Sequence, residues 1–196
     1  MSRPHLRRYA VRPAITSLGV ACLVVAMSLV AGGPAHAQGE DVVVSSGSQF
    51  TLSESGTYSS LAVTGTAPDG GHSRFTADAS LLLTSSTFPT LLVTNGGVLD
   101  VSASVTAGYP SAYAVVSNGG RLNLNSGTLS MGTLTVQGSD AISRTSGAYA
   151  VDVLELLQNA SLTYTASDSI GSPSDVFLGQ IGEIHLESGA TLTLER

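Results

Sequence analysis

The chain has 196 residues, of which 42% are hydrophobic and only 11% are charged, and its formal net charge is −6. It contains one cysteine, so a framework of internal disulfides is excluded. All fourteen acidic residues follow residue 39, against four of the eight arginines, so residues 38–196 carry a formal net charge of −10. A field of this sign repels nucleic acid and anionic lipid, and neither is expected as a partner.

Residues 1–37 have the layout of a secretory signal peptide. Four arginines precede an almost wholly apolar run, residues 14–31, and residues 35–37 supply the small-x-small pattern that signal peptidase requires. We therefore expect an N-terminal signal helix that is cleaved after Ala37. A membrane anchor is the alternative, because the apolar run approaches the length of a bilayer-spanning helix. Pro34 and the small residues that close the run favour cleavage.

The route of export stays open between the general secretory and the twin-arginine pathways. Arg7 and Arg8 are followed by Tyr9, which resembles a twin-arginine signal, but the surrounding residues match that signal poorly. Cys22 is followed by strongly apolar residues, unlike the cysteine of a lipoprotein. We interpret Cys22 as a small apolar member of the leader.

Residues 38–196 are long enough for one domain with a substantial core. Ser, Thr, Gly, Val and Leu dominate this region, a composition that favours strands and turns over helices. Apolar residues alternate with polar ones along many short segments, as in strands with one buried face. Residues 151–158, the most helix-like stretch, alternate too and are predicted as strand. The polar residues between the apolar pairs are expected to face water: Thr64, Asp100, Asn123, Thr135, Thr163, His185 and Thr193.

One phrase of the sequence repeats in the middle of the chain. Residues 91–101 hold an apolar strand, an Asn-Gly-Gly corner and a second strand, and residues 113–124 repeat them, so that Asn118 follows Asn95 by 23 residues. A fixed period of this size is typical of a solenoid, in which each coil buries its apolar face against its neighbours. We therefore predict a parallel β-helix. The alternative is an antiparallel β-sandwich, because an Asn-Gly step is also the strongest short signal for a hairpin.

The phrase Gly-Gly-x-Leu-x-apolar, at residues 96–101 and 119–124 and in degenerate form at 188–194, resembles the passenger domains of bacterial autotransporters and related surface adhesins. The resemblance covers roughly residues 41–196. It implies a right-handed parallel β-helix, exported by a Gram-negative bacterium to the cell surface or the medium. It also implies a structural or adhesive role, with glycans or proteins of a host or environmental surface as partners.

The end of the sequence departs from that family. Autotransporter passengers are followed by a transmembrane β-barrel, whereas this sequence stops within a strand phrase at residues 194–196. We therefore expect residues 38–196 to form a passenger-like domain that is truncated at its C-terminus. A last coil without a cap leaves strand edges and apolar side chains unpaired, so self-association through the C-terminal coil is expected.

Few side chains after the leader are suited to catalysis. Stacked coils place residues one coil apart side by side. Asp100, Asp152 or Glu183 could thus supply the two carboxyl groups that glycoside hydrolysis requires. β-Helical enzymes that act on acidic polysaccharides, such as pectate lyases, add Arg or Lys to such carboxylates, and basic residues are scarce here. We predict no enzymatic activity, no catalytic residues and no cofactor. The alternative is a secreted, pectate-lyase-like carbohydrate-active or carbohydrate-binding β-helix.

Three loops are expected to interrupt the coils and to offer contact surfaces. The first is rich in Gly and charge and contains His72, but no second His or Cys lies at ligand spacing, so it is interpreted as an exposed insertion without a metal. The second contains two tyrosines, whose large amphipathic rings are enriched at interfaces. The residues predicted to make contacts in the three loops are Asp69, His72, Arg74, Tyr109, Tyr113, Asp168 and Asp175.

Overall fold

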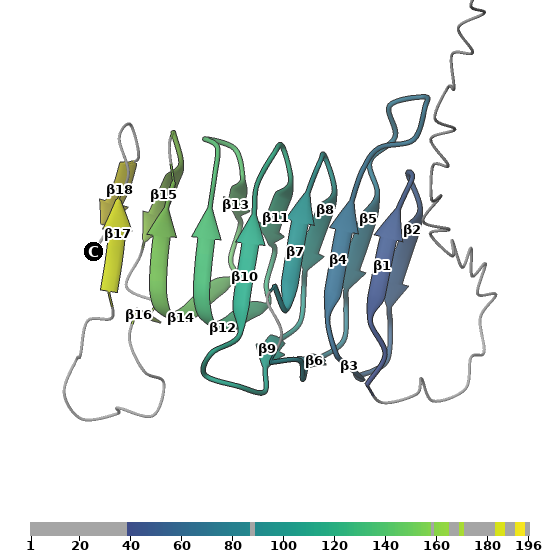
Figure 1. Ribbon diagram of the computed structural model, residues 1–196, viewed down its shortest axis with the longest axis horizontal. Helices are drawn as coiled ribbons and strands as arrows, with labels where there is room; N and C mark the ends of the chain where they lie inside the picture. Colours follow the sequence, from purple (N-terminus) through teal and green to yellow (C-terminus); the bar gives the residue numbers. More distant parts are fainter. Residues whose placement is uncertain are drawn as a thin grey trace, which may run out of the picture. The chain divides into compact units, whose positions relative to one another are not determined.

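The short alternating segments of this chain form strands that stack in one direction, as the coils of a parallel β-helix (Figure 1). The computed structural model describes residues 39–86, 89–157, 159–164, 169–170, 183–186 and 191–194. The predicted signal peptide with its cleavage site, and the predicted contact residues Asp168 and Asp175, lie outside these ranges. Every regular element within them is a strand, and no helix long and apolar enough to cross a membrane is found there.

The coils contribute strands to three faces, which we call A, B and C. Face A consists of β1 (Val42–Ser45), β4 (Leu61–Thr64), β7 (Leu91–Thr94), β10 (Tyr113–Val116), the second halves of β12 (Thr128–Val136) and β14 (Ala148–Leu156), and β17 (Glu183–Leu186). Face B consists of β2 (Gln49–Leu52), β5 (Arg74–Ala77), β8 (Val98–Val101), β11 (Arg121–Leu124) and β13 (Ile142–Arg144). Face C consists of β3 (Gly56–Tyr58), β6 (Leu81–Leu83), β9 (Val105–Ala107), the first halves of β12 and β14, and β16 (Ser169–Ile170). A further pair is formed by β15 (Ser161–Tyr164) and β18 (Thr191–Leu194).

Strands of neighbouring coils pair in parallel throughout the described part of the chain. In Figure 1 the chain rises along face A on the near side, crosses to face B on the far side, and advances from β1 toward β17, which is a right-handed winding. The predicted parallel β-helix is therefore confirmed, and the antiparallel sandwich is wrong. The single antiparallel bridge within the described ranges joins Thr66 to His72 inside a loop.

The core runs along the axis of the solenoid because the register brings like positions of successive coils together. On face B the inward residues Phe50, Phe75, Leu99, Leu122 and Ile142 follow one another in register. The rings of Phe50 and Phe75 stack with their centroids 5.0 Å apart, and Leu99 and Leu122 are fully buried. Burial of one such side chain contributes about 1.5–3 kcal/mol, so the stack of coils is held mainly by its aliphatic and aromatic interior.

The corner between faces A and B is a hairpin turn used in a solenoid. Asn95 and Gly96 both have positive φ, 52° and 80°, and a backbone hydrogen bond of 2.9 Å closes the turn, as in type I′ geometry. The same turn recurs at residues 117–120 and 45–48. The Asn-Gly step therefore predicts the local turn correctly, but the strand that follows enters another face and does not pair back on the preceding strand.

Adjacent coils approach very closely just after this turn. A Cβ atom on Gly97 would lie 2.2 Å from the carbonyl oxygen of Val63, and one on Gly120 would lie 2.3 Å from that of Val93. Distances this short are excluded for any side chain. The second glycine of the Asn-Gly-Gly corner is therefore required by contact between coils, whereas the first is required by its backbone conformation.

The coils differ in length, although their strands stay in register. Leu91 pairs with Ala114, 23 residues later, whereas Leu61 pairs with Leu91, 30 residues later. The loop between β4 and β5 accounts for much of the difference and projects beyond the other corners on its side (Figure 1). The predicted strand at residues 151–158 is confirmed as the second half of β14, up to Leu156.

Candidate functional surfaces

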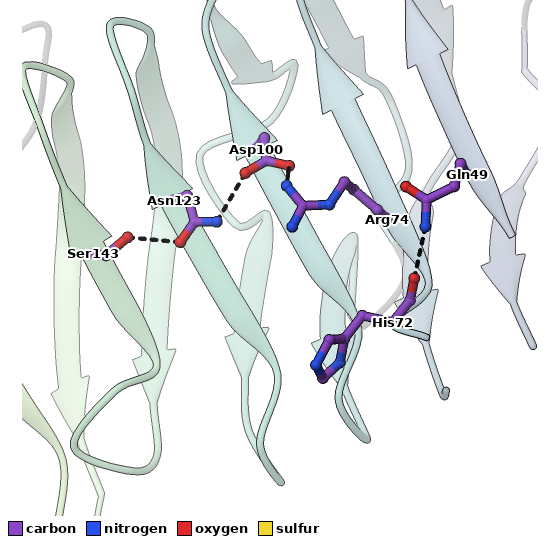
Figure 2. A network of polar contacts seen from close by, with 6 residues as sticks. All are labelled: Gln49, His72, Arg74, Asp100, Asn123 and Ser143. Atoms are coloured by element: carbon purple, nitrogen blue, oxygen red, sulfur yellow. Dashed lines mark hydrogen bonds and ion pairs between the residues drawn. The ribbon is translucent and has the colours of Figure 1, made fainter. Parts of the chain in front are cut away.

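A chain of polar contacts crosses the outer side of face B (Figure 2). Arg74 forms an ion pair with Asp100 through Nη1 and Oδ2. Asn123 donates from Nδ2 to Asp100 Oδ1 over 2.8 Å, and Ser143 donates from Oγ to Asn123 Oδ1 over 2.6 Å. We call these four residues the polar ladder. Because they come from β5, β8, β11 and β13, the polar ladder joins four successive strands of the face.

Asp100 is buried, which corrects the sequence-based expectation that it faces water. It points to the outer side of β8, yet only 6% of its surface is exposed. The reason is the spacing of parallel strands, about 4.8 Å, which lets the side chains of Arg74 and Asn123 on the neighbouring coils cover it. A pattern read along one strand cannot show that side chains of the neighbouring coils cover a residue such as Asp100.

The polar ladder is better suited to holding coils in register than to chemistry. Both oxygens of Asp100 are engaged, so this carboxylate is not free to act as a base, a nucleophile or a metal ligand. Removing either partner would leave a buried polar group unsatisfied, which makes a shifted register costly. Arg74, predicted as a contact residue in a loop, lies instead in β5 with 43% of its side chain exposed.

A second polar cluster lies on the outer side of face A. The Tyr113 hydroxyl donates to Glu155 Oε2 over 2.5 Å, and Thr135 Oγ1 lies 2.7 Å from both that oxygen and the Tyr113 hydroxyl. The one proton of the Thr135 hydroxyl serves one of these two acceptors at a time. These three residues, which we call the Tyr113 cluster, connect β10, β12 and β14.

The Tyr113 cluster corrects two sequence-based expectations. Thr135 was expected to face water but is 5% exposed, because Tyr113 and Glu155 cover it from the adjacent coils. Tyr113 was expected in a contact loop but begins β10, with its hydroxyl fixed by Glu155. Burial, and then the hydrogen bond to Glu155, raise the pKa of the Tyr113 hydroxyl. The hydroxyl therefore stays protonated and remains a donor at neutral pH.

The loop between β4 and β5 contains two of the predicted contact residues, Asp69 and His72, and both are exposed. Asp69 Oδ1 accepts a hydrogen bond from Gly71 N over 3.0 Å, which shapes the tip of the loop. His72 Nδ1 lies 2.6 Å from the carbonyl oxygen of Gly96, so the base of the loop rests on the next coil. His72 O also accepts from Gln49 Nε2 over 2.8 Å (Figure 2). Within the described residues, no group of three or more His, Cys, Asp or Glu is arranged to hold a metal ion.

Tyr109 is the predicted contact residue that the structure leaves most open. It follows β9 in the short loop that leads to β10, and 49% of its surface is exposed. The preceding residue, Gly108, lies beside face C, where a Cβ on it would be 3.9 Å from Leu82 Cδ1. Tyr109 is thus an exposed aromatic residue, and the glycine before it lies beside Leu82 of β6.

The carboxylates proposed to meet across coils are divided between faces. Asp100 lies in β8 on face B, whereas Asp152 lies in β14, in the long sheet formed by faces A and C. Among the residues that the structure describes, the buried Oδ1 of Asp152 has no hydrogen-bond partner, and burial raises the pKa of this carboxyl. Glu183 follows Asp152 by one coil, where its backbone pairs with Val153; its side chain lies outside what the structure describes.

Face C carries an open groove of about 370 Å³ that sequence reasoning missed. It crosses β3, β6 and β9, and its lining contains only uncharged residues. Its outward residues fall in two columns, Ser55, Ser80 and Ser104 in one and Thr57, Leu82 and Thr106 in the other. The sequence does contain a signal, since a serine stands just before each of β3, β6 and β9. This signal can be recognised only when the register of the strands is known.

Comparison with models of protein families, with curated proteins and with solved structures gave no match.

Proposed function

We propose that this chain is an exported β-helical protein that serves as a structural or adhesive segment at the surface of a Gram-negative bacterium, in the manner of an autotransporter passenger. The observation that carries the proposal is the continuous stack of parallel coils, with an apolar interior and polar contacts between coils on faces A and B. Such a stack fixes its outer residues at regular spacings. That property suits a stalk, or a surface that holds a partner over several coils.

The sequence supports export and the resemblance supports surface display. The basic start, apolar run and small-x-small site of residues 1–37 are the features of a cleaved leader. An enzyme of the pectate-lyase kind has less support. Asp100 has both of its oxygens engaged, and Asp152 lies in a different sheet.

Export and display are tested by producing the full chain, with its own leader, in a Gram-negative host. We expect a product that begins at Gln38, is found outside the cytoplasm, and is degraded when intact cells are treated with protease. Substitution Ala37→Arg should block processing, because signal peptidase needs a small residue there. An unprocessed chain that stays in the cytoplasm would contradict the proposal. Adherence of displaying cells to glycan-coated and protein-coated surfaces then tests the adhesive role.

A further inference from the structure

We propose that the groove on face C binds a neutral polysaccharide, laid along the axis of the solenoid across β3, β6 and β9. The inference rests on the proposed function, since it names the class of partner that an exported surface segment would hold. It is carried by three observations, which are the alignment of hydroxyl groups, an exposed leucine among them, and the uncharged lining of the groove.

The hydroxyl groups are aligned by the register of face C. Gly56, Leu81 and Val105 pair in sequence, so the residues just before them, Ser55, Ser80 and Ser104, occupy equivalent positions on three coils. Parallel strands are about 4.8 Å apart, which is comparable to the length of one sugar unit in an extended glycan. Each hydroxyl both donates and accepts, as the hydroxyls of a neutral sugar do.

A second column lies two residues farther along the same strands. It contains Thr57 and Thr106 on either side of Leu82, and Ser104 Oγ lies 3.1 Å from Thr106 Oγ1. The two columns continue onto β12 as Thr128 and Ser130, since β9 and β12 pair in register. A ligand that extends beyond the groove would therefore meet further hydroxyl groups.

The exposed leucine lies on β6, the middle strand of the groove. Leu82 is 39% exposed, and Gly108 leaves space beside its Cδ1 atom. Tyr109 follows Gly108 and is 49% exposed. Sugar rings present apolar C–H faces, and binding sites for them combine aliphatic or aromatic contacts with a few polar groups that fix orientation.

The charge of the groove decides between neutral and acidic glycans. Residues 38–196 carry a formal net charge of −10, yet the lining of the groove contains only uncharged residues. The charged residue nearest to the lining in sequence is the acidic Glu54. An acidic polysaccharide would meet no cation there and would be repelled by the net charge. A neutral polysaccharide meets neither penalty.

The test is retention of the purified full chain on insoluble polysaccharides, compared among variants. The neutral set is cellulose, β-1,3-glucan, starch and mannan, and immobilised polygalacturonate is the acidic comparison. We expect retention on at least one neutral polysaccharide and none on polygalacturonate. Substitutions Leu82→Asp and Ser80→Asp place a charge in the groove at exposed positions and should each weaken retention by about tenfold or more.

Val43→Asp is the matched control, because Val43 is 63% exposed and lies on face A. It should bind as the original chain does, and circular dichroism should show all variants folded. The proposal is overturned if no neutral polysaccharide retains the chain, if the groove variants bind unchanged, or if polygalacturonate binds at least as well. Export of Leu82→Asp to the cell surface should be normal, so failure of the groove and failure of the proposed function are read from separate assays.

Discussion

Faces B and C of the solenoid are built from the same alternation of apolar and polar residues, but their outward polar side chains make different contacts. On face B, the polar ladder uses both oxygens of Asp100 and links four strands. On face C, the hydroxyls of Ser55, Ser80 and Ser104 line an open groove. A repeated polar position in this solenoid therefore either contacts the neighbouring coils, as on face B, or stays open at the surface, as on face C.

The tightness of the corner that precedes face B gives the prediction with the largest effect. Gly97→Ala should destabilise the fold by about 3 kcal/mol, because its Cβ would lie 2.2 Å from the carbonyl oxygen of Val63. Gly108→Ala, at the end of β9 on face C, is the control. Its Cβ would meet only ordinary contacts at 3.5 Å and beyond, so its cost should stay below about 0.5 kcal/mol. Urea unfolding followed by circular dichroism measures both changes in stability. Equal costs would contradict the claim that coils approach more closely at Gly97 than at Gly108.

Removal of the central carboxylate of the polar ladder should cost less. Asp100→Ala leaves the Asn123 amide and the Arg74 guanidinium without their acceptor, and we expect a loss of about 2 kcal/mol. The loss stays below that of a fully buried ion pair, because 43% of the Arg74 side chain is exposed and can be rehydrated. Thr106→Ala on face C should cost less than about 0.5 kcal/mol. If Thr106→Ala proved as costly as Asp100→Ala, the hydroxyls of face C would have to be contacts between coils.

The sequence alone predicts the course of the backbone well. The parallel winding follows from the repeated phrase at residues 91–101 and 113–124, and its core positions, such as Leu99 and Leu122, follow from period-two alternation. These features depend on residues close together in the chain, or on a period that can be counted. The turn at Asn95 is predicted for the same reason.

The sequence does not predict which residues of one coil are buried by side chains of the adjacent coils. Asp100 and Thr135 were expected in water because their own strands place them outward, and they are buried by side chains 20 or more residues away. The groove on face C was missed for the same reason, since Ser55 and Ser80 become neighbours only once the register is fixed. Coils of unequal length, with 19 to 30 residues between partners, prevent that register from being counted.

Tyr113, at the start of β10, and Tyr109, in the loop before it, give a smaller, paired effect. Tyr113→Phe removes the donor to Glu155 and should cost about 1 kcal/mol, whereas Tyr109→Phe, at an exposed position, should leave stability unchanged. The pKa of Tyr113 is raised in the folded chain, so its contribution is complete below the unfolded value near 10 and is lost as the pH rises above it. The difference between Tyr113→Phe and the original chain should therefore shrink in melts above pH 10. A difference that grew with pH would contradict the assigned hydrogen bond.

The smallest effect is expected at Asp152, whose carboxylate differs from that of Asp100 in its hydrogen bonding. Within the described part of the chain its buried Oδ1 has no hydrogen-bond partner, and burial raises the pKa of the carboxyl in the folded chain. The folded state therefore favours the protonated carboxyl, and the stability that protonation provides is lost as the pH rises through the acidic range. Asp152→Asn should raise stability at neutral pH by less than about 0.5 kcal/mol and change nothing near pH 3. Asp140→Asn, at an exposed position, controls for the change in net charge. If Asp152→Asn instead lowered stability at neutral pH, the carboxylate would have a stabilising partner, as Asp100 has.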